Sequence, residues 1–242
     1  MKSIKDGYGY NERLFSGGLR SKLHLARFHW VASEIVKQNC KLDSVLELGC
    51  FDGKLLDFLP VTPSRYVGID ANWEGGLDMA KKRWANVPNL SFIEASTPEE
   101  ISFDDGINFT AAVVMETLEH VSPDQVDGYL RKIALHLNGY LFITVPNEKG
   151  IVFLAKWLIK KTLGIDEDKY RYSELMNAFL GRMERVERNQ HKGFDYNVVI
   201  NTIMNHFDVV EVTGHPLGFL PRSLCFGIGI VAKSKEFSPS SL

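Results

Sequence analysis

The stretch VLELGCFDG, residues 45–53, decides the fold of this 242-residue chain. It begins as a continuous apolar strand and turns directly into a loop with glycines at its first and last turn positions. Gly49 permits a sharp turn, and Gly53 permits a close backbone approach. A buried strand followed by such a loop is typical of a nucleotide site at the carboxyl end of a strand in an open parallel sheet.

The same kind of apolar run recurs along the chain, and most runs are separated by stretches that suit a helix. Continuous apolar runs indicate strands buried on both faces, and the alternation indicates βαβ units in a mainly parallel sheet. The last two predicted strands are joined without a helix and should be antiparallel neighbours. The predicted strands are Ser44–Leu48, Tyr66–Ile69, Leu90–Ile93, Ala111–Met115, Tyr140–Val145, Phe207–Val212 and Cys225–Ala232.

Helices are predicted around these strands. Ser122 is expected to cap the helix Pro123–Leu137, which should end at a left-handed cap on Asn138 and Gly139. The other predicted helices are Arg20–Asn39, Gly76–Ala85, Ile151–Leu163 and Tyr196–His206. We therefore expect an N-terminal arm and helix over residues 1–40, and one α/β domain over residues 41–242 with a helical insertion at about 148–190.

Composition narrows the classes of partner and compartment. The formal net charge is −2, from 28 basic and 30 acidic residues, which argues against nucleic acid as the partner. Cys40, Cys50 and Cys225 are scattered without a C-x-x-C pair, which is typical of a reducing compartment and predicts a cytoplasmic protein. The first residues lack the apolar run of a signal peptide, and no stretch reaches the ~20 apolar residues of a membrane span.

Four acidic residues lie at or just after the ends of predicted strands, at nearly constant spacing. Glu47, Asp70, Glu94 and Glu116 are 23, 24 and 22 residues apart, so each interval is one strand-plus-helix unit and all four should share one rim of the sheet. Asp70 is suited to accept both hydroxyls of a ribose, or alternatively to cap the next turn. Glu47 would repel a phosphate and attract a cationic amino group or a sulfonium. A dinucleotide loop is disfavoured because G-x-G-x-x-G is absent.

The segment that follows the fourth predicted strand contains several ionisable side chains. Residues 116–120, ETLEH, place two carboxylates and an imidazole at the strand's carboxyl end. In one helical turn, Glu116, Glu119 and His120 would fall on one side. Such groups suit a divalent cation, or a glutamate that tunes His120 as a general base. The structural alternative is that Glu119 and His120 brace the loop while His191 caps a helix.

These motifs resemble class I S-adenosylmethionine-dependent methyltransferases, in particular the E-x-L-E-H-V group, similar to methyltransferase types 11 and 12. The resemblance is close over Lys41–Val145 and loose over Asn189–Ala232. It implies a Rossmann-like three-layer sandwich with strand order 3-2-1-4-5-7-6 and strand seven antiparallel. Phe51 replaces the central glycine of the motif and predicts a bulkier wall on the cofactor pocket. The residues implied to bind S-adenosylmethionine are Glu47, Gly49, Cys50, Phe51, Gly53, Asp70, Ala71, Glu94, Ala95, Ser96, Met115 and Glu116.

The resemblance also implies an activity. In ubiquinone-pathway O-methyltransferases and small-RNA 3′-end 2′-O-methyltransferases, E-x-x-E-H supplies metal ligands, the latter with a further histidine. This implies Mg²⁺ or Mn²⁺ on Glu116, Glu119, His120 and His191, although many family members keep such residues without a known metal. The expected reaction is O-methylation of a small-molecule, sugar or lipid-linked acceptor, with His120, Glu119 and His191 as catalytic residues. RNA 3′-end methylation and a non-catalytic scaffold are the alternatives.

Three further segments outside the predicted cofactor site have a possible role in function. Helix Ile151–Leu163 combines large apolar residues with lysines, and we expect a core-facing helix, with contact to a membrane interface as the alternative. Tyr8, Tyr10 and Arg13 lie on an N-terminal arm that would close over the cofactor or make an oligomer contact. Residues 215–219 are expected where the acceptor pocket forms.

Overall fold

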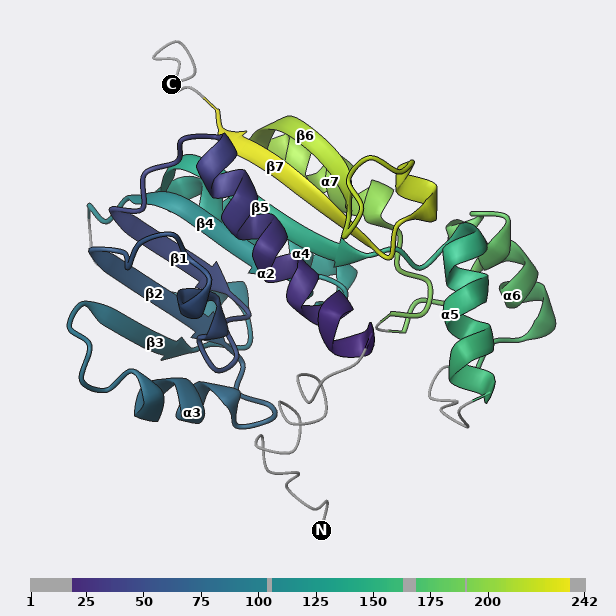
Figure 1. The fold of residues 1–242 in the computed structure, drawn as a ribbon, viewed down its shortest axis with the longest axis horizontal. Coiled ribbons are helices and arrows are strands. Elements are labelled where there is room, and N and C mark those ends of the chain that lie inside the picture. The colour runs from purple at the N-terminus through teal and green to yellow at the C-terminus, as the bar shows by residue number, and fades with distance from the viewer. Residues whose placement is uncertain (1–18, 104–105, 163–168, 190, 236–242) are drawn as a thin grey trace.

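The structure is a computed structural model that describes residues 19–103, 106–162, 169–189 and 191–235 (Figure 1). Its centre is a seven-stranded sheet with the order β3-β2-β1-β4-β5-β7-β6, as the family resemblance implied. The strands are β1 Ser44–Leu48, β2 Arg65–Asp70, β3 Leu90–Glu94, β4 Phe109–Met115, β5 Leu137–Pro146, β6 Phe207–His215 and β7 Gly227–Ser234.

Strand β7 is antiparallel to both β5 and β6, and the other neighbouring strands pair in parallel, which confirms the prediction. Because of this arrangement, the carboxyl ends of β1 to β5 meet at one rim. The register brings the end of β1 beside those of β2 and β4, and it pairs Asp70 with Glu94. The four spaced acids therefore lie along this rim, as predicted.

Helices cover both faces of the sheet (Figure 1). Helices α4 and α7 pack on one face through apolar residues such as Leu130 and Ile203, and α2 packs on the other through Val31 and Ile35. The α-helices are α2 Leu19–Lys37, α3 Gly76–Arg83, α4 Pro123–His136, α5 Gly150–Thr162, α6 Tyr172–Phe179 and α7 Tyr196–His206. Short 3₁₀ helices are η1 Lys54–Asp57, η2 Pro98–Glu100, η3 Met183–Arg185 and η4 Arg222–Leu224.

The end of α4 differs from the sequence prediction. The helix ends at His136, and the chain enters β5 directly, so Asn138 and Gly139 form no helix cap. Gly139 lies so close to β4 that a Cβ on it would stand 2.0 Å from the carbonyl oxygen of Thr110. The glycine is needed there for strand contact, not for a left-handed cap. At the helix start, Ser122 occupies the N-cap position as predicted, but its side chain makes no cap hydrogen bond.

The helical insertion forms a small lobe beside the sheet (Figure 1). Helices α5 and α6 and the 3₁₀ turn η3 enclose a separate apolar cluster of Phe153, Ala178, Met183 and Val186. In the part of the chain that the structure describes, no helix is both long and apolar enough to cross a bilayer. The arm with Tyr8, Tyr10 and Arg13 lies outside the described residues.

Candidate functional site

The glycine loop after β1 touches the loop after β4. Gly49 and Gly53 have φ angles of 77° and 69°, the left-handed region that glycine favours. A Cβ on Gly49 would lie 2.0 Å from Oγ1 of Thr117, so only glycine allows the two loops to approach this closely. The Thr117 hydroxyl lies 3.3 Å from the carbonyl oxygen of Leu48 and 3.0 Å from that of Met115. The two segments with the strongest sequence signals are thus joined at the rim.

Phe51, which stands where the family motif has its central glycine, has a left-handed backbone conformation. Its φ angle is 46°, which is uncommon for a large side chain. The backbone N–H of Phe51 donates to Oδ2 of Asp70 at 3.0 Å, and its ring packs so closely over Gly76 that a Cβ there would lie 2.2 Å from the ring. The additional bulk therefore points to the start of α3.

Asp70 holds the glycine loop and also caps its own turn. Besides Phe51, its carboxylate accepts the backbone N–H of Asn72 at 2.7 Å. Burial raises the pKa of Asp70 above its ordinary value. Each carboxylate oxygen accepts one of these N–H groups and keeps a lone pair for a further donor. The two interpretations of Asp70, a turn cap and a ribose acceptor, are therefore compatible.

The loop after β3 lies beside Asp70. The backbone N–H of Ala95 donates to the carbonyl of Asp70 at 3.0 Å, and the Asn72 amide lies 3.4 Å from Glu94. The N–H of Ser96 donates to Glu100 at 2.6 Å. The predicted cofactor residues Glu94, Ala95 and Ser96 are thus next to Asp70, and Ala71 follows it in the same turn.

Glu47, which was expected to attract a cationic amino group or a sulfonium, is deeply buried. It is 2% exposed, accepts a hydrogen bond from the Tyr66 hydroxyl, and has a pKa that burial raises to about 8. Burial therefore opposes the charge that the sequence assigned to Glu47, and a cationic neighbour would favour that charge. The neighbouring predicted cofactor residues Cys50 and Met115 are also buried.

Arg27 on α2 supplies a positive charge that the sequence did not reveal. This guanidinium lowers the pKa of three acids, the buried Glu47 and Glu119 and the partly buried Glu116, against the larger effect of burial. Its Nε is buried without a hydrogen-bond partner. The charge of Arg27 therefore acts on acids at the end of β1 and in the loop after β4. A single arginine within a long amphipathic helix does not by itself predict a residue of the functional site.

The loop after β4 contains two acids, Glu116 and Glu119, with buried carboxylate oxygens that lack a hydrogen-bond partner. Glu116 has a φ angle of 48°, and its backbone N–H donates to the carbonyl of Thr144 at 2.9 Å. Oε1 of Glu116 and both carboxylate oxygens of Glu119 are buried without a hydrogen-bond partner. Burial raises the pKa of both acids, and Glu116 further raises that of Glu119. Unpaired buried carboxylates are costly, so these oxygens favour a cationic or hydrogen-bonding ligand.

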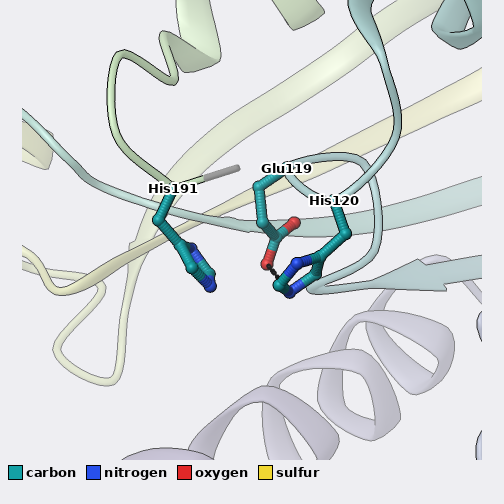
Figure 2. Close-up of side chains that lie close together, drawn as sticks. All are labelled: Glu119, His120 and His191. Carbon is teal, nitrogen blue, oxygen red and sulfur yellow. Dashed lines mark ion pairs between the residues drawn. The ribbon is translucent and has the colours of Figure 1, made fainter. Parts of the chain in front are cut away.

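His191 completes a cluster with Glu119 and His120 (Figure 2). Nε2 of His120 lies 3.9 Å from Oε1 of Glu119, and the two histidine rings are 4.6 Å apart at an angle of 83°. One ligand atom from each of the three residues lies within 4.8 Å of the other two. The geometry brings together three of the four predicted metal ligands, and Glu116 lies outside this group.

Two contacts fix the segment that carries His191. The guanidinium of Arg188 donates to the carbonyl of Glu119 at 2.8 Å, and Asn189 and Lys192 exchange backbone hydrogen bonds around the turn. The proposed structural role of His191 as a helix cap is wrong, because the side chain of Asp195 caps α7 by accepting the N–H of Asn197. Arg188 and Asp195 were not among the predicted site residues.

The cluster has the chemistry of a base or of a cation site. Burial and the positive charge of Arg188 lower the pKa of His120, so its imidazole is neutral at pH 7 and able to accept a proton. One carboxylate and two imidazoles also match the ligands of a divalent transition metal. The unpartnered oxygens of Glu119 fit such an ion, and Mn²⁺ suits this mixed donor set better than Mg²⁺.

Comparisons with known proteins agree with this geometry. A family model described as a methyltransferase domain matches residues 45–139, which include the glycine loop, the four rim acids and His120. No curated protein matches the sequence at a significant level.

Solved structures share the fold over most of the chain. An S-adenosylmethionine-dependent methyltransferase from Clostridium acetobutylicum has 11% identity and a TM-score of 0.66, over 95% of this chain and 99% of that one. The N-methyltransferase NodS from Bradyrhizobium japonicum, bound to S-adenosylhomocysteine, has 14% identity and a TM-score of 0.56, over 96% and 100%. The methyltransferase domain of a bacterial Hen1 has 16% identity and a TM-score of 0.56, over 87% and 99%.

At these identities the solved structures establish the fold, while the family model covers the residues that form the rim. Taken with the sheet order and the glycine loop, they support the class I S-adenosylmethionine-dependent methyltransferase family for this chain, with S-adenosylmethionine as the methyl donor.

Proposed function

We propose that this enzyme methylates a hydroxyl group, with Glu119, His120 and His191 activating the acceptor. The observation that supports this is the cluster itself, which has ligand atoms within 4.8 Å of one another and a buried Glu119 whose two carboxylate oxygens lack a hydrogen-bond partner. An amine acceptor becomes nucleophilic once it has lost its ammonium proton, whereas a hydroxyl needs help in losing its proton. A base or a cation at this place is therefore most useful to a hydroxyl acceptor.

The reaction is an in-line displacement. The bond between the sulfonium sulfur and the methyl carbon breaks as the bond from the acceptor oxygen to that carbon forms, and the acceptor proton passes to a base. Neutral His120 is the residue that would take this proton, and Glu119 would stabilise the imidazolium that results. The products are a methyl ether and S-adenosylhomocysteine, and the proton then leaves to solvent because His120 is partly exposed.

A divalent cation would be held by Glu119, His120 and His191. When bound, it would lower the pKa of a coordinated hydroxyl group. In the absence of a cation, Glu119 keeps a buried carboxyl group with a raised pKa and His120 is free to act as the base.

The acceptor class that we favour is a small molecule, a sugar or a lipid-linked molecule. The formal net charge of −2 gives no overall attraction to a phosphate backbone. The second candidate is the 3′ end of RNA. Its support is the fold shared with the bacterial Hen1 methyltransferase domain together with the glutamate and histidine cluster.

The test is a methyl-transfer assay with methyl-labelled S-adenosylmethionine. Three sets of acceptors are compared, namely hydroxylated small molecules and lipids, the matching amines, and short RNAs with free or blocked 3′-terminal hydroxyls. We expect label on a hydroxylated small molecule or lipid, lost in Glu119→Gln. Transfer to amines alone would contradict O-methylation, and transfer only to RNA with a free 2′-hydroxyl would establish the second candidate. Repeating each assay with a chelator and then with Mn²⁺ tests the need for a cation.

A further inference from the structure

Glu47 and Tyr66 form a buried polar pair on the face of the sheet that α2 covers. The parallel register of β1 and β2 places Val45 beside Tyr66 and Glu47 beside Gly68. Because side chains alternate along a strand, Tyr66 and Glu47 share one face and lie diagonally across the two strands. The Tyr66 hydroxyl donates a hydrogen bond to Oε2 of Glu47. Strand register therefore brings this hydroxyl to the carboxyl group.

Apolar side chains enclose the pair. Tyr66 is 0% exposed and Glu47 is 2% exposed. The Tyr66 ring belongs to the apolar cluster that includes Phe28 and Met115, and its centroid lies 5.6 Å from that of the Phe92 ring. An ionised carboxylate is unfavourable in such surroundings unless positive charge is paired with it. Glu47 therefore favours its neutral form when no cation is bound.

The charges near Glu47 do not replace such a cation. Burial has the largest effect and raises the pKa of Glu47 to about 8, although the hydrogen bond to its Oε2 lowers this pKa. Asp52 and Asp70 raise the pKa further, and Arg27 lowers it by a smaller amount. Burial also raises the pKa of the Cys50 thiol well above its ordinary value, so the thiol is neutral near pH 7. Among the described residues, the charges that act on Glu47 are thus more negative than positive.

We propose that Tyr66 is a positioning residue that holds the Glu47 carboxyl group for the ammonium group of the methyl donor, and that Glu47 gives up its proton when this ammonium binds. The Tyr66 hydroxyl occupies Oε2 of Glu47, which leaves Oε1 to accept the ammonium N–H. The O–H bond of the carboxyl group breaks, its electron pair stays on the carboxylate, and the proton passes to solvent. The proposal requires S-adenosylmethionine as the donor and does not depend on the acceptor.

The ammonium suits this carboxylate better than the sulfonium of the same donor. A buried carboxylate needs hydrogen bonds as well as opposite charge, and the sulfonium has no N–H to donate. A free α-amino group has a pKa of about 7.7–8.0, so it is protonated at pH 6.5. Glu47, with a pKa of about 8, is neutral at that pH in the free protein. Proton release should therefore be nearly complete at pH 6.5 and should decrease as the pH rises toward 8.

The test is isothermal titration calorimetry of the full chain at pH 6.5, without an acceptor. S-adenosylmethionine and S-adenosylhomocysteine are each titrated in phosphate and in imidazole buffer, because a released proton adds the ionisation heat of the buffer to the observed heat. We expect about one proton per bound ligand for both, since both carry the ammonium. 5′-Methylthioadenosine, which lacks the amino-acid part, should release none.

Three variants assign the effect to residues. Tyr66→Phe should bind both amino-acid-containing ligands about tenfold more weakly and methylthioadenosine normally, because ionised Glu47 loses a charge-assisted hydrogen bond. Glu47→Gln should release no proton with any ligand. Tyr129→Phe is the matched control, because Tyr129 is 5% exposed in the apolar cluster on the opposite face of the sheet, and it should keep the wild-type affinities and proton count. Thermal unfolding checks that each variant is folded.

Several outcomes would overturn the proposal. The wild type would release no proton, or Glu47→Gln would release as many as the wild type. Equal weakening of methylthioadenosine and S-adenosylhomocysteine in Tyr66→Phe would mean that Tyr66 only supports the fold. Release with S-adenosylmethionine but not with S-adenosylhomocysteine would assign Glu47 to the sulfonium instead.

This measurement is independent of the methyl-transfer assay, because it contains no acceptor. O-methylation without proton release on donor binding would remove the role of Tyr66 and Glu47 and leave the proposed function. Proton release without O-methylation would have the opposite meaning.

Discussion

The two halves of the rim assemble their side chains in different ways. Along β1, β2 and β3, the predicted cofactor residues lie at the strand ends or in the loops that follow them, and the parallel register alone brings Asp70 beside Glu94. Around β4, the cluster joins Glu119 and His120 to His191, which comes from the far end of the insertion. The first region is thus determined by local sequence and sheet register, and the second by a tertiary contact through Arg188.

The two regions also differ in how well their carboxylates are satisfied. Asp70 accepts two backbone N–H groups, so the protein itself holds it in place. Both oxygens of Glu119 are buried without a hydrogen-bond partner, which costs stability in the absence of a ligand. The comparison indicates that the first region is pre-organised for binding, while the second keeps unsatisfied groups for the acceptor or a cation.

The largest expected effect separates chemistry from binding. His120→Ala should lower kcat about 10² to 10⁴-fold, because the proposed proton acceptor is lost. Its affinity for S-adenosylmethionine should stay unchanged, since the first region is intact, and isothermal titration calorimetry measures this. His206→Ala, at the end of α7, is the control and should change neither quantity. A parallel loss of affinity in His120→Ala would show that the two regions are not separate.

The next effect concerns the contact between the regions. Gly49→Ala should lower the free energy of unfolding by about 2–4 kcal/mol, because the methyl group is strained at positive φ and collides with Thr117. Gly75→Ala is the matched control, since Gly75 has a φ angle of 73° and nothing within 4 Å of the added atom. It should cost only about 1 kcal/mol. Urea unfolding measures both, and equal losses would mean that the loops do not restrain each other.

A smaller effect tests the first region alone. Asp70→Asn should weaken binding of S-adenosylmethionine about 10 to 100-fold, because the amide nitrogen would face an N–H donor of Phe51 or Asn72 and would lose acceptor capacity. Calorimetry measures the affinity. Asp208→Asn, an exposed position on β6, is the control and should bind normally. Unchanged affinity in Asp70→Asn would remove Asp70 from the cofactor site.

The smallest effect is a pH dependence of stability. Burial raises the pKa of Glu47 to about 8, so between pH 4.5 and 8 the folded state binds a proton that the unfolded state has released. The stability contribution of Glu47 therefore falls as pH rises, by up to about 1.4 kcal/mol per pH unit. Glu47→Gln should reduce this slope in urea unfolding between pH 6.5 and 8. An identical slope in the variant would mean that Glu47 is ionised when folded.

His215 should produce the opposite trend over a lower pH range. Burial, together with the charges of Arg27 and Lys156, lowers the pKa of His215 to about 4. Between about pH 6.5 and 4 the unfolded state binds the additional proton, so the stability contribution of His215 falls as pH decreases. The window above pH 6.5 therefore isolates Glu47 from this histidine.

Much of the architecture could be predicted because its signals are local. Continuous apolar runs indicated the buried strands, and β1 and α7 have the bounds that the pattern predicted. The sheet order came from the family resemblance and is confirmed. Local signals also misled at Asn138 and Gly139, where a typical helix-cap pair lies in a strand instead. The residue types Asn and Gly favour a left-handed helix cap at this position. The close contact between Gly139 and Thr110 of β4 instead keeps the pair in a strand.

The cofactor rim was predictable and the electrostatics of the site were not. Regular spacing places Glu47, Asp70, Glu94 and Glu116 along one edge, since each β-α unit returns the chain to the same rim. The role of Arg27 depends on how α2 packs over the sheet, and nothing in its neighbouring residues reveals that packing.

By itself, the sequence determined the strands of the sheet and the glycine loop, because strand periodicity and strand-end motifs are properties of neighbouring residues, and the resemblance carried by those motifs implied the methyl donor. Only the tertiary structure decided that His191 joins Glu119 and His120 while Glu116 stays apart, and that the left-handed Phe51 is accommodated over Gly76. These are contacts between segments distant in sequence. They depend on packing and burial, which cannot be inferred from the residues next to each position in the sequence.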